Sequence, residues 1–139
     1  MRILACIALL CLVASLRGAP VPKELKVPSD AEKLQGVWIV VKGEPGSKGY
    51  RWTFEGEKLF AGGTADTKGL EYGFVIQPDA SPREMDFGGN GRLSYRGIYK
   101  FVGDELHIVY HGSDRPTEFS AAVGGRHQDV MRRFVEEDK

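Results

Sequence analysis

The sequence predicts an all-β domain, a small antiparallel up-and-down barrel of about eight strands that is preceded by one short helix. Three observations favour this fold. Apolar and polar residues alternate with a period of two in short runs, turn-forming residues recur roughly every ten positions, and helical patterns are almost absent. Because open sheet edges invite association, a sheet of this size closes into a barrel or splits into a sandwich, and hairpins in sequence order favour the barrel.

The first 19 residues are interpreted as a secretory signal peptide. Arg2 precedes an uninterrupted apolar run over residues 3 to 16, and small and turn-forming residues follow. The run is shorter than the roughly 20 apolar residues of a spanning helix, so no membrane span is expected. Cleavage after Ser15 or after Gly18 fits the pattern, and a periplasmic or extracellular location is expected.

The composition limits the classes of partner. Both cysteines, Cys6 and Cys11, lie in the signal segment, so the exported chain is expected to lack disulfides and thiol ligands. Loss of Arg2 and Arg17 with that segment leaves 17 basic residues against 19 acidic ones, with both signs scattered along the chain. No nucleic-acid partner is expected, because no basic stripe attracts a polyanion. The remaining length fits one domain, which is expected to be a monomer.

The domain is expected to span residues 29–136, after a Pro-spaced tether over residues 20–28. Ser29 and Glu32 form a capping box, and Gly36 supplies a stop signal, so one or two helical turns fit between them.

Strands are expected through the rest of the chain. Tyr50, Trp52 and Phe54 share one face of residues 50–55, because successive strand side chains alternate. Turn-forming dipeptides separate neighbouring strands at 56–57, 90–91 and 103–104. The other expected strands are "GVWIVVKG", "KLF", "LEYGFVIQ", "REMDF", "IYKFV", "ELHIVY", "PTEFSAA" and "DVMRRFV".

"KLQGVW" after a single short helix resembles the lipocalin signature. The order "LQGVWIVV", "FVIQPDASPREMDF" and "RGIYKFVGDELHIVYHGSDRPTEFSA" more closely resembles the planctomycete-type lipocalin-like domain of exported proteins with no assigned function, over about residues 33 to 135. Two local departures are Val109-Tyr110, where that family often has a cysteine, and the polar "GGRHQDV" before the last strand.

This resemblance implies a lipocalin-like barrel in which Gly36 and Trp38 take the signature positions and Trp38 closes the barrel floor. It also implies that an arginine late in the last strand lies over Trp38, and Arg132 and Arg133 both qualify. The "RPTEF" motif adds further signature residues, which are Arg115, Pro116 and Glu118.

The segment 107–120 is the most polar candidate for chemistry. His107 and His111 would share a face of a helix, but on a strand they lie roughly 13 Å apart at about 3.3 Å per residue, too far for one metal ion. Ser113 lacks the strand-to-helix elbow of serine hydrolases. Arg115 and Glu118 could pair across the barrel rim.

Other candidate motifs also have structural explanations. Glu84 and Asp86 share a strand face, but that face lies opposite Met85 and Phe87, so both carboxylates are expected in solvent and not as a catalytic pair. The Asp104-Glu105 pair is explained by its turn, and "GGTADTKG" lacks the ending of a phosphate-binding loop. No catalytic residue, metal or cofactor is therefore assigned, and the protein is not expected to be an enzyme.

The positive functional feature is an aromatic inner face. An eight-stranded barrel is either filled by its own side chains or holds one small ligand, and the sequence leaves this open. The first hypothesis is binding of a small apolar or amphipathic molecule, and the alternative is an envelope or extracellular protein-interaction module with a solid core. The residues expected to line the interior are Trp38, Trp52, Tyr72, Tyr99, Tyr110 and Phe119.

Overall fold

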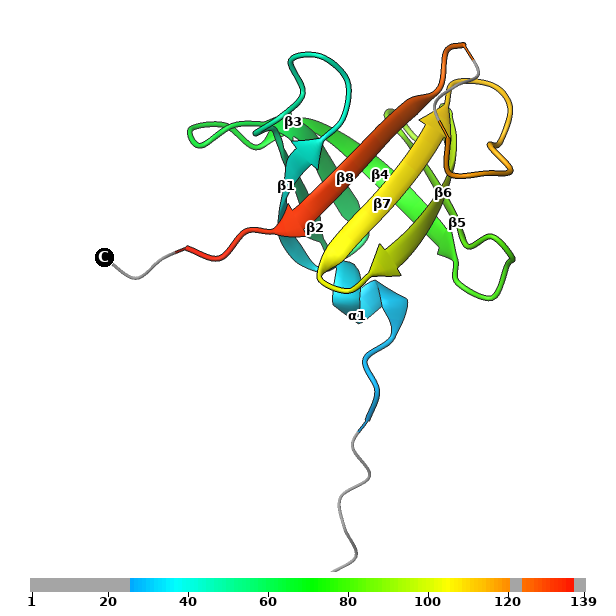
Figure 1. The fold of residues 1–139 in the computed structure, drawn as a ribbon, viewed down its shortest axis with the longest axis horizontal. Helices are drawn as coiled ribbons and strands as arrows, with labels where there is room; N and C mark the ends of the chain where they lie inside the picture. The colour runs from blue at the N-terminus through cyan, green and yellow to red at the C-terminus, as the bar shows by residue number, and fades with distance from the viewer. Residues whose placement is uncertain (1–25, 121–123, 137–139) are drawn as a thin grey trace, which may run out of the picture.

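The computed structural model describes residues 26–120 and 124–136. Within these residues, eight antiparallel strands form a closed barrel in which each strand pairs with its sequence neighbours and the last strand closes on the first (Figure 1). The elements are α1 (Asp30–Leu34), β1 (Gly36–Lys42), β2 (Arg51–Glu55), β3 (Lys58–Gly63), β4 (Gly69–Gln77), β5 (Glu84–Gly88), β6 (Tyr95–Val102), β7 (Glu105–His111) and β8 (His127–Arg133). The predicted all-β up-and-down barrel after one short helix is confirmed.

The segment interpreted as a signal peptide and most of the tether lie outside the described residues. The described part of the tether, residues 26–28, carries no regular secondary structure. None of the described helices is both long and apolar enough to cross a lipid bilayer.

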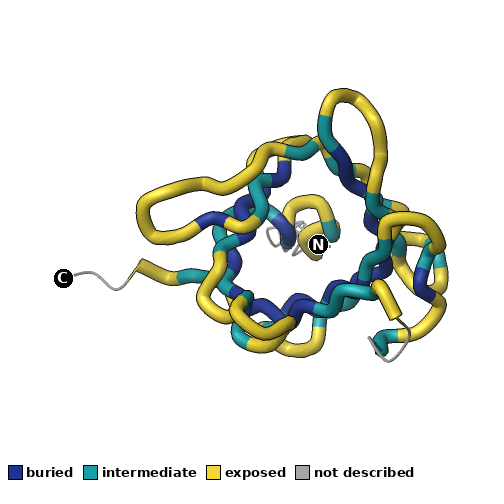
Figure 2. Tube along the Cα trace, turned by 90° about the horizontal axis from the view of Figure 1, so that it is seen from above, coloured by how far each residue is buried: buried dark blue, intermediate teal, exposed yellow. Residues whose placement is uncertain are grey.

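The barrel has two unlike ends. α1 lies beneath one end, which we call the closed end, and the long connections 43–50, 64–68 and 89–94 leave the opposite end, which we call the open end (Figure 1). Viewed along the barrel, α1 sits inside the outline of the ring, while the loops project outward and are exposed (Figure 2). The two ends of the barrel are therefore covered by different segments, the closed end by α1 and the open end by loops.

The capping box predicted for the helix is present. The Ser29 hydroxyl accepts a hydrogen bond from the Glu32 amide at 3.3 Å, and the Glu32 carboxylate accepts one from the Ser29 amide at 2.8 Å. Leu34 ends α1 and is fully buried, and its carbonyl accepts a hydrogen bond from Trp38 Nε1 at 2.8 Å. These contacts fasten the helix across the closed end.

Strand alternation sorts side chains between the interior and the outer face. On β6, for example, Tyr99 is buried and Phe101 packs against the core, whereas Lys100 between them has the opposite phase. The fully or nearly buried interior residues are Leu34, Trp38, Val40, Trp52, Phe54, Leu59, Met85, Phe87, Tyr99, Leu106, Ile108 and Met131. The predicted aromatic inner face is thus present.

Two of the three predicted hairpin turns are tight. Glu55 pairs with Lys58 across Gly56-Glu57, and Val102 pairs with Glu105 across Gly103-Asp104. The third dipeptide, Asn90-Gly91, adopts left-handed backbone angles, but it lies inside the longer loop 89–94.

The predicted strand "PTEFSAA" is wrong for its described residues, because residues 116–120 contain no strand. Pro116 is fully buried there, so this segment packs against the barrel wall instead of joining the sheet.

Candidate functional site

A small hollow at the open end of the barrel is the candidate site, and we call it the mouth cup. It has a volume of about 220 Å3. The residues that line it are Val40, Ser47, Tyr50, Trp52, Ala61, Gly62, Leu70, Tyr72, Tyr110 and Asp129. Apolar and aromatic side chains make up most of this lining, and no lysine or arginine of residues 26–120 and 124–136 belongs to it.

Aromatic rings form the floor of the mouth cup. The Trp52 ring lies 5.6 Å from the Phe87 ring and 5.7 Å from the Tyr110 ring, measured between centroids. Phe87 also contacts Tyr72 and Tyr95, with centroid distances of 5.7 and 5.0 Å. Because these rings pack against one another, they separate the cup from the closed end.

The interior below that floor is filled by side chains. Phe54, Met85, Leu106 and Met131 are each exposed by no more than 1%. The sequence left open whether the barrel interior is filled or hollow. Both descriptions apply, at different ends: the lower barrel is a packed core, and the mouth carries a small hollow.

Asp129 is the buried charge of the mouth cup. It lies on the inner face of β8 with the same phase as Met131, and it is only 6% exposed. Its carboxylate makes no hydrogen bond and no ion pair with another residue in the described ranges 26–120 and 124–136. A Cβ atom at Gly43 would lie 2.3 Å from Asp129 Oδ1 and 2.5 Å from Ser47 Oγ, so glycine at position 43 leaves room for the carboxylate.

This environment favours the neutral form of Asp129. Burial, together with the nearby negative charge of Glu44, raises the pKa of Asp129 to about 6, while His127 acts in the opposite direction. Since an unpaired buried carboxylate is costly, Asp129 is poised to gain from a hydrogen-bond donor or a cation.

His127 and Glu44 form an ion pair at the rim beside Asp129. His127 Nδ1 lies 2.6 Å from Glu44 Oε1, and the His127 ring stacks on the Tyr110 ring with centroids 5.0 Å apart. Burial, followed by the charge of Asp129, raises the pKa of the Tyr110 hydroxyl. Tyr110 is therefore neutral at physiological pH and can donate a hydrogen bond.

The structure brings together three of the six residues expected to line a binding interior. Trp52, Tyr72 and Tyr110 line the mouth cup. Trp38 and Tyr99 point inward, but they belong to the closed end, where the Tyr99 hydroxyl donates to Asp30 at 2.7 Å.

The expectation that Phe119 points into the barrel is wrong, because its ring lies on the outer side. Lys100 Nζ lies 4.3 Å from the centroid of the Phe119 ring, and Lys100 projects from the outer face of β6. Residue 119 is not part of a strand, so the alternation that placed it inside does not apply.

The sequence left open whether Arg132 or Arg133 lies over Trp38, and in the structure it is Arg133. Its guanidinium lies 4.5 Å above the Trp38 ring, and it donates to the carbonyl oxygens of Gln35, at 2.6 Å, and Lys33. Pairing of Trp38 with Arg133 in the sheet fixes this choice. Arg132 points to the outer face and pairs with Glu105 at 2.9 Å.

Gly36 leaves room for the Arg133 guanidinium. It has a φ of +110°, and a Cβ atom there would lie 3.0 Å from Arg133 Nη1. Glycine at 36 therefore meets both a backbone and a steric requirement.

Arg115 has a different role from the one expected. It donates to both carboxylate oxygens of Asp86, at 2.6 and 2.8 Å, and to the Gly97 carbonyl at 2.9 Å, and its Nε lies 3.4 Å from Glu84. Glu84 and Asp86 do lie opposite Met85 and Phe87, but they are half-buried partners of Arg115 instead of solvated charges. Glu118 is exposed and is not the partner of Arg115.

The histidines of the polar segment each have a separate local partner. His107 lies 2.9 Å from Glu105, and His111 Nδ1 accepts hydrogen bonds from the amides of Ser113 and Asp114. In the described part of the chain, no group of three or more metal-ligating side chains comes together.

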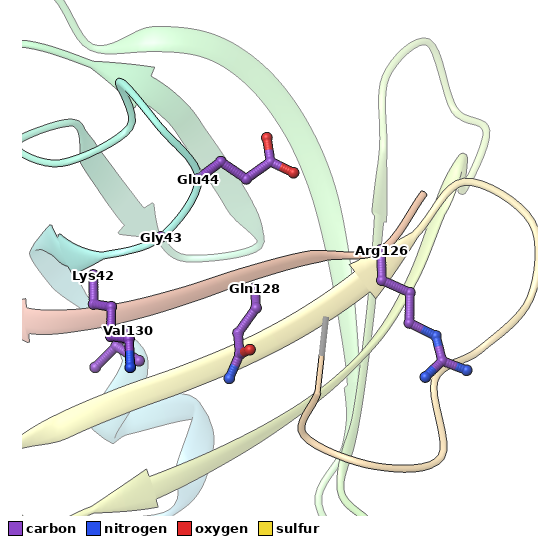
Figure 3. A pocket seen from close by; sticks show the side chains of 6 residues that line it. All are labelled: Lys42, Gly43, Glu44, Arg126, Gln128 and Val130. Atoms are coloured by element: carbon purple, nitrogen blue, oxygen red, sulfur yellow. The ribbon is translucent and has the colours of Figure 1, made fainter. Parts of the chain in front are cut away.

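A second hollow lies on the outer face, beside the loop 43–50 and β8. It has a volume of about 310 Å3, and Figure 3 shows Gln128 and Val130 projecting from β8 toward the outside of the barrel. The Arg126 guanidinium extends away from Glu44 in this view (Figure 3). Lys42 and Glu44 at its border are exposed, and this hollow lacks the aromatic wall of the mouth cup.

Asp129, His127 and Glu44 are the site residues that sequence reasoning missed. The signal for Asp129 was its spacing: it stands two residues before Met131, so alternation places both on one face. No family model, curated protein or solved structure matched this chain in our comparisons.

Proposed function

We propose that this protein is a lipocalin-like barrel that binds one small, mainly apolar molecule in the mouth cup, without catalysing a reaction on it. The observation that carries the proposal is the contrast within the barrel, where a packed core supports an open hollow walled by Trp52, Tyr72 and Tyr110. Aromatic walls with a few polar groups are typical of small-molecule sites.

The size of the mouth cup limits the ligand. An apolar cavity of about 150 Å3 is large enough for benzene, whereas drug-sized pockets occupy about 300–1,000 Å3. At about 220 Å3, the cup fits a single ring with a short side chain, or a short alkyl chain, and not a fatty acid or a haem.

Binding of neutral single-ring and short-chain probes tests this proposal. Tryptophan fluorescence and the melting temperature are measured with 2-phenylethanol and 1-hexanol up to millimolar concentrations. The chain contains two tryptophans, of which Trp52 lies in the cup and Trp38 at the closed end. We expect saturable quenching of Trp52 and a rise in melting temperature, because a ligand that binds only the folded state stabilises it.

Two changes at the cup separate specific binding from surface adsorption. Ala61→Leu fills part of the cup from β3 and is expected to weaken binding at least tenfold. Leu70→Ser removes an exposed leucine at the rim and is expected to weaken binding a few-fold, whereas Leu93→Ser removes an exposed leucine that does not line the cup and serves as its matched control.

Absence of saturable binding by every probe would contradict the proposal. Equal effects of Leu70→Ser and Leu93→Ser, with no effect of Ala61→Leu, would also contradict it, because binding would then lie elsewhere. The protein-interaction module would become the better account, with the exposed loops as its working surface.

We also propose that the protein acts after export and belongs to the planctomycete-type lipocalin-like family that its motifs resemble. The pattern over residues 1–19 and the "GIYK", "GDEL" and "RPTEF" motifs support this proposal. Mass spectrometry of the secreted or periplasmic protein is expected to find an N-terminus after Ser15 or Gly18, and recovery of the intact chain from the cytoplasm alone would contradict export.

A further inference from the structure

Asp129 is the acidic side chain that lines the mouth cup. It combines deep burial with a carboxylate that has no partner among the residues described, and it borders the hollow itself. Buried carboxylates in folded proteins are normally paired with a cation or accept several hydrogen bonds. A complementary group on a ligand would supply what the protein itself does not.

The charges around Asp129 favour a cation over an anion. Glu44 adds a second negative charge at the rim, and the nearby basic side chain, His127, already lies 2.6 Å from Glu44. Among the residues that the structure describes, no lysine or arginine lines the cup. A carboxylate or phosphate ligand would therefore meet like charge with no compensating partner.

The aromatic wall suits the same kind of ligand. Trp52, Tyr72 and Tyr110 present rings to the hollow, and ring faces attract cations through their quadrupole. Together with Asp129 they provide both an ion-pair partner and a surface that tolerates a desolvated ammonium group.

We propose that the ligand of the mouth cup is a small amine whose protonated nitrogen pairs with Asp129 and whose single ring or short chain packs on Trp52, Tyr72 and Tyr110. This assignment rests on the proposed function. It adds the charge of the ligand and names Asp129 as the residue that recognises this charge. No covalent step is involved.

A charge series of probes of similar shape tests the assignment. The probes are 2-phenylethylamine, 2-phenylethanol and 3-phenylpropanoate, which carry a positive charge, no charge and a negative charge at pH 8. Alkylamines, like the lysine side chain, titrate near pH 10, so the amine is protonated under these conditions. Dissociation constants are measured by calorimetry on the folded protein, and wild type is expected to bind the amine at least tenfold more tightly than the alcohol, with the acid weakest.

Asp129→Asn keeps the shape of the side chain and removes its charge. We expect this variant to bind the amine and the alcohol with affinities within about threefold of each other. Asp114→Asn is the matched control, because it removes the same charge from an exposed position in the loop after β7, and it is expected to keep the preference for the amine. Circular dichroism and a melting curve establish that each variant is folded.

A pH series on the wild-type protein needs no substitution. The pKa of Asp129 is about 6 in the free protein, and protonation removes the charge that the amine requires. Affinity for 2-phenylethylamine is therefore expected to fall about tenfold for each pH unit below 6, while affinity for 2-phenylethanol changes little. In the described part of the chain, the other titratable groups that face Asp129 or border the cup are Glu44, Tyr50, Tyr72, Tyr95, Tyr110 and His127.

The same pH series in Asp129→Asn separates Asp129 from these neighbours, and from His127 in particular. If the affinity for 2-phenylethylamine still falls steeply below pH 6 in that variant, another group recognises the charge of the amine and the assignment of Asp129 is overturned.

The outcomes distinguish this inference from the proposed function. If all three probes bind wild type with similar affinity, or the acid binds best, the mouth cup binds small molecules but the amine assignment is wrong. If none of the probes binds, the proposed function fails and the assignment fails with it. A preference for the amine that is lost in Asp129→Asn and kept in Asp114→Asn supports both.

Discussion

The closed and open ends of the barrel differ in how they treat buried polar groups. At the closed end, Trp38 Nε1 donates to the Leu34 carbonyl at 2.8 Å, and the Tyr99 hydroxyl donates to Asp30 at 2.7 Å. At the open end, no donor within the described residues reaches the Asp129 carboxylate. Natural proteins pair nearly all buried polar groups, so an exception calls for a physical reason.

The closed end stabilises the fold, and the open end provides the space for binding. The closed end is sealed by the Trp38 ring, the capped helix and Arg133. The open end keeps a hollow and an unpaired carboxylate, which lower stability in the free protein. Proteins often accept such a cost where a ligand binds, because the ligand restores the missing interactions.

Trp38→Ala is the change with the largest expected effect. It removes a buried ring, the donor to Leu34 and the surface under Arg133, and the expected loss of unfolding free energy is about 3–5 kcal/mol. Tyr50→Ala at the open rim, where the side chain is 46% exposed, is expected to cost less than about 1 kcal/mol. Urea denaturation measures both, and equal losses would remove the distinction between the two ends.

Asp129→Asn is expected to act in the opposite direction and stabilise the free protein at pH 8. The pKa of Asp129 lies above its unfolded value, so the folded state holds a proton that the unfolded state releases between about pH 4 and 6. At about 1.4 kcal/mol for each pH unit, wild type loses about 3 kcal/mol across this window, and a buried amide retains about 1 kcal/mol of desolvation cost.

The net gain from Asp129→Asn is therefore expected to be about 2 kcal/mol at pH 8 and to become a small net loss near pH 4, where only the desolvation cost of the amide remains. Urea denaturation of both proteins at the two pH values measures it. A destabilised variant at pH 8 would show that the carboxylate has favourable partners in the folded protein and is not the unpaired charge of the open end.

Adjacent arginines at the end of β8 provide the next comparison. Arg133 lies on Trp38 and donates to two carbonyl oxygens, so Arg133→Ala is expected to cost about 1–2 kcal/mol. Arg132 forms an exposed pair with Glu105, and Arg132→Ala is expected to cost about 0.5 kcal/mol or less. Chemical denaturation in low salt compares them, and a larger cost for Arg132 would place the seal of the closed end elsewhere.

Tyr99 and Tyr72 provide the most closely matched comparison of the two ends, with the smallest expected difference in stability. Tyr99→Phe removes the hydroxyl that donates to Asp30 and is expected to cost about 1 kcal/mol. Tyr72→Phe removes a hydroxyl that bonds to no residue in the described ranges, and is expected to change stability by less than about 0.5 kcal/mol. Thermal or urea denaturation compares the two, and if both changes cost the same, the Tyr99 hydroxyl contributes nothing specific to the closed end.

The barrel was predictable because its signals are local. The Ser29–Glu32 capping box, the turn at 56–57 and the alternation around Trp52 each follow from spacing in the sequence. The position of Phe119 was not predictable by the same rule, because Pro116 packs the chain against the outer wall and alternation holds only within a strand.

The mouth cup was only half predictable. Alternation found Trp52, Tyr72 and Tyr110, but whether the interior is hollow depends on how the rings pack in three dimensions. Asp129 was missed because an inward carboxylate breaks the rule of apolar residues inside, and its polar neighbours in "GGRHQDV" hide the phase of β8. The choice of Arg133 over Arg132 likewise required the register between β1 and β8.

The location of a bound probe on the barrel shows whether the mouth cup is the binding site. In an NMR titration with 2-phenylethylamine at pH 7.5, signals from the open end, including those of Val40, Leu70 and Asp129, are expected to shift together with one saturable curve. Signals from Leu106 and Val102, on the closed-end side of the packed core, are expected to stay in place. Shifts confined to the closed end or the outer face, or no saturable shift at all, would contradict binding in the mouth cup.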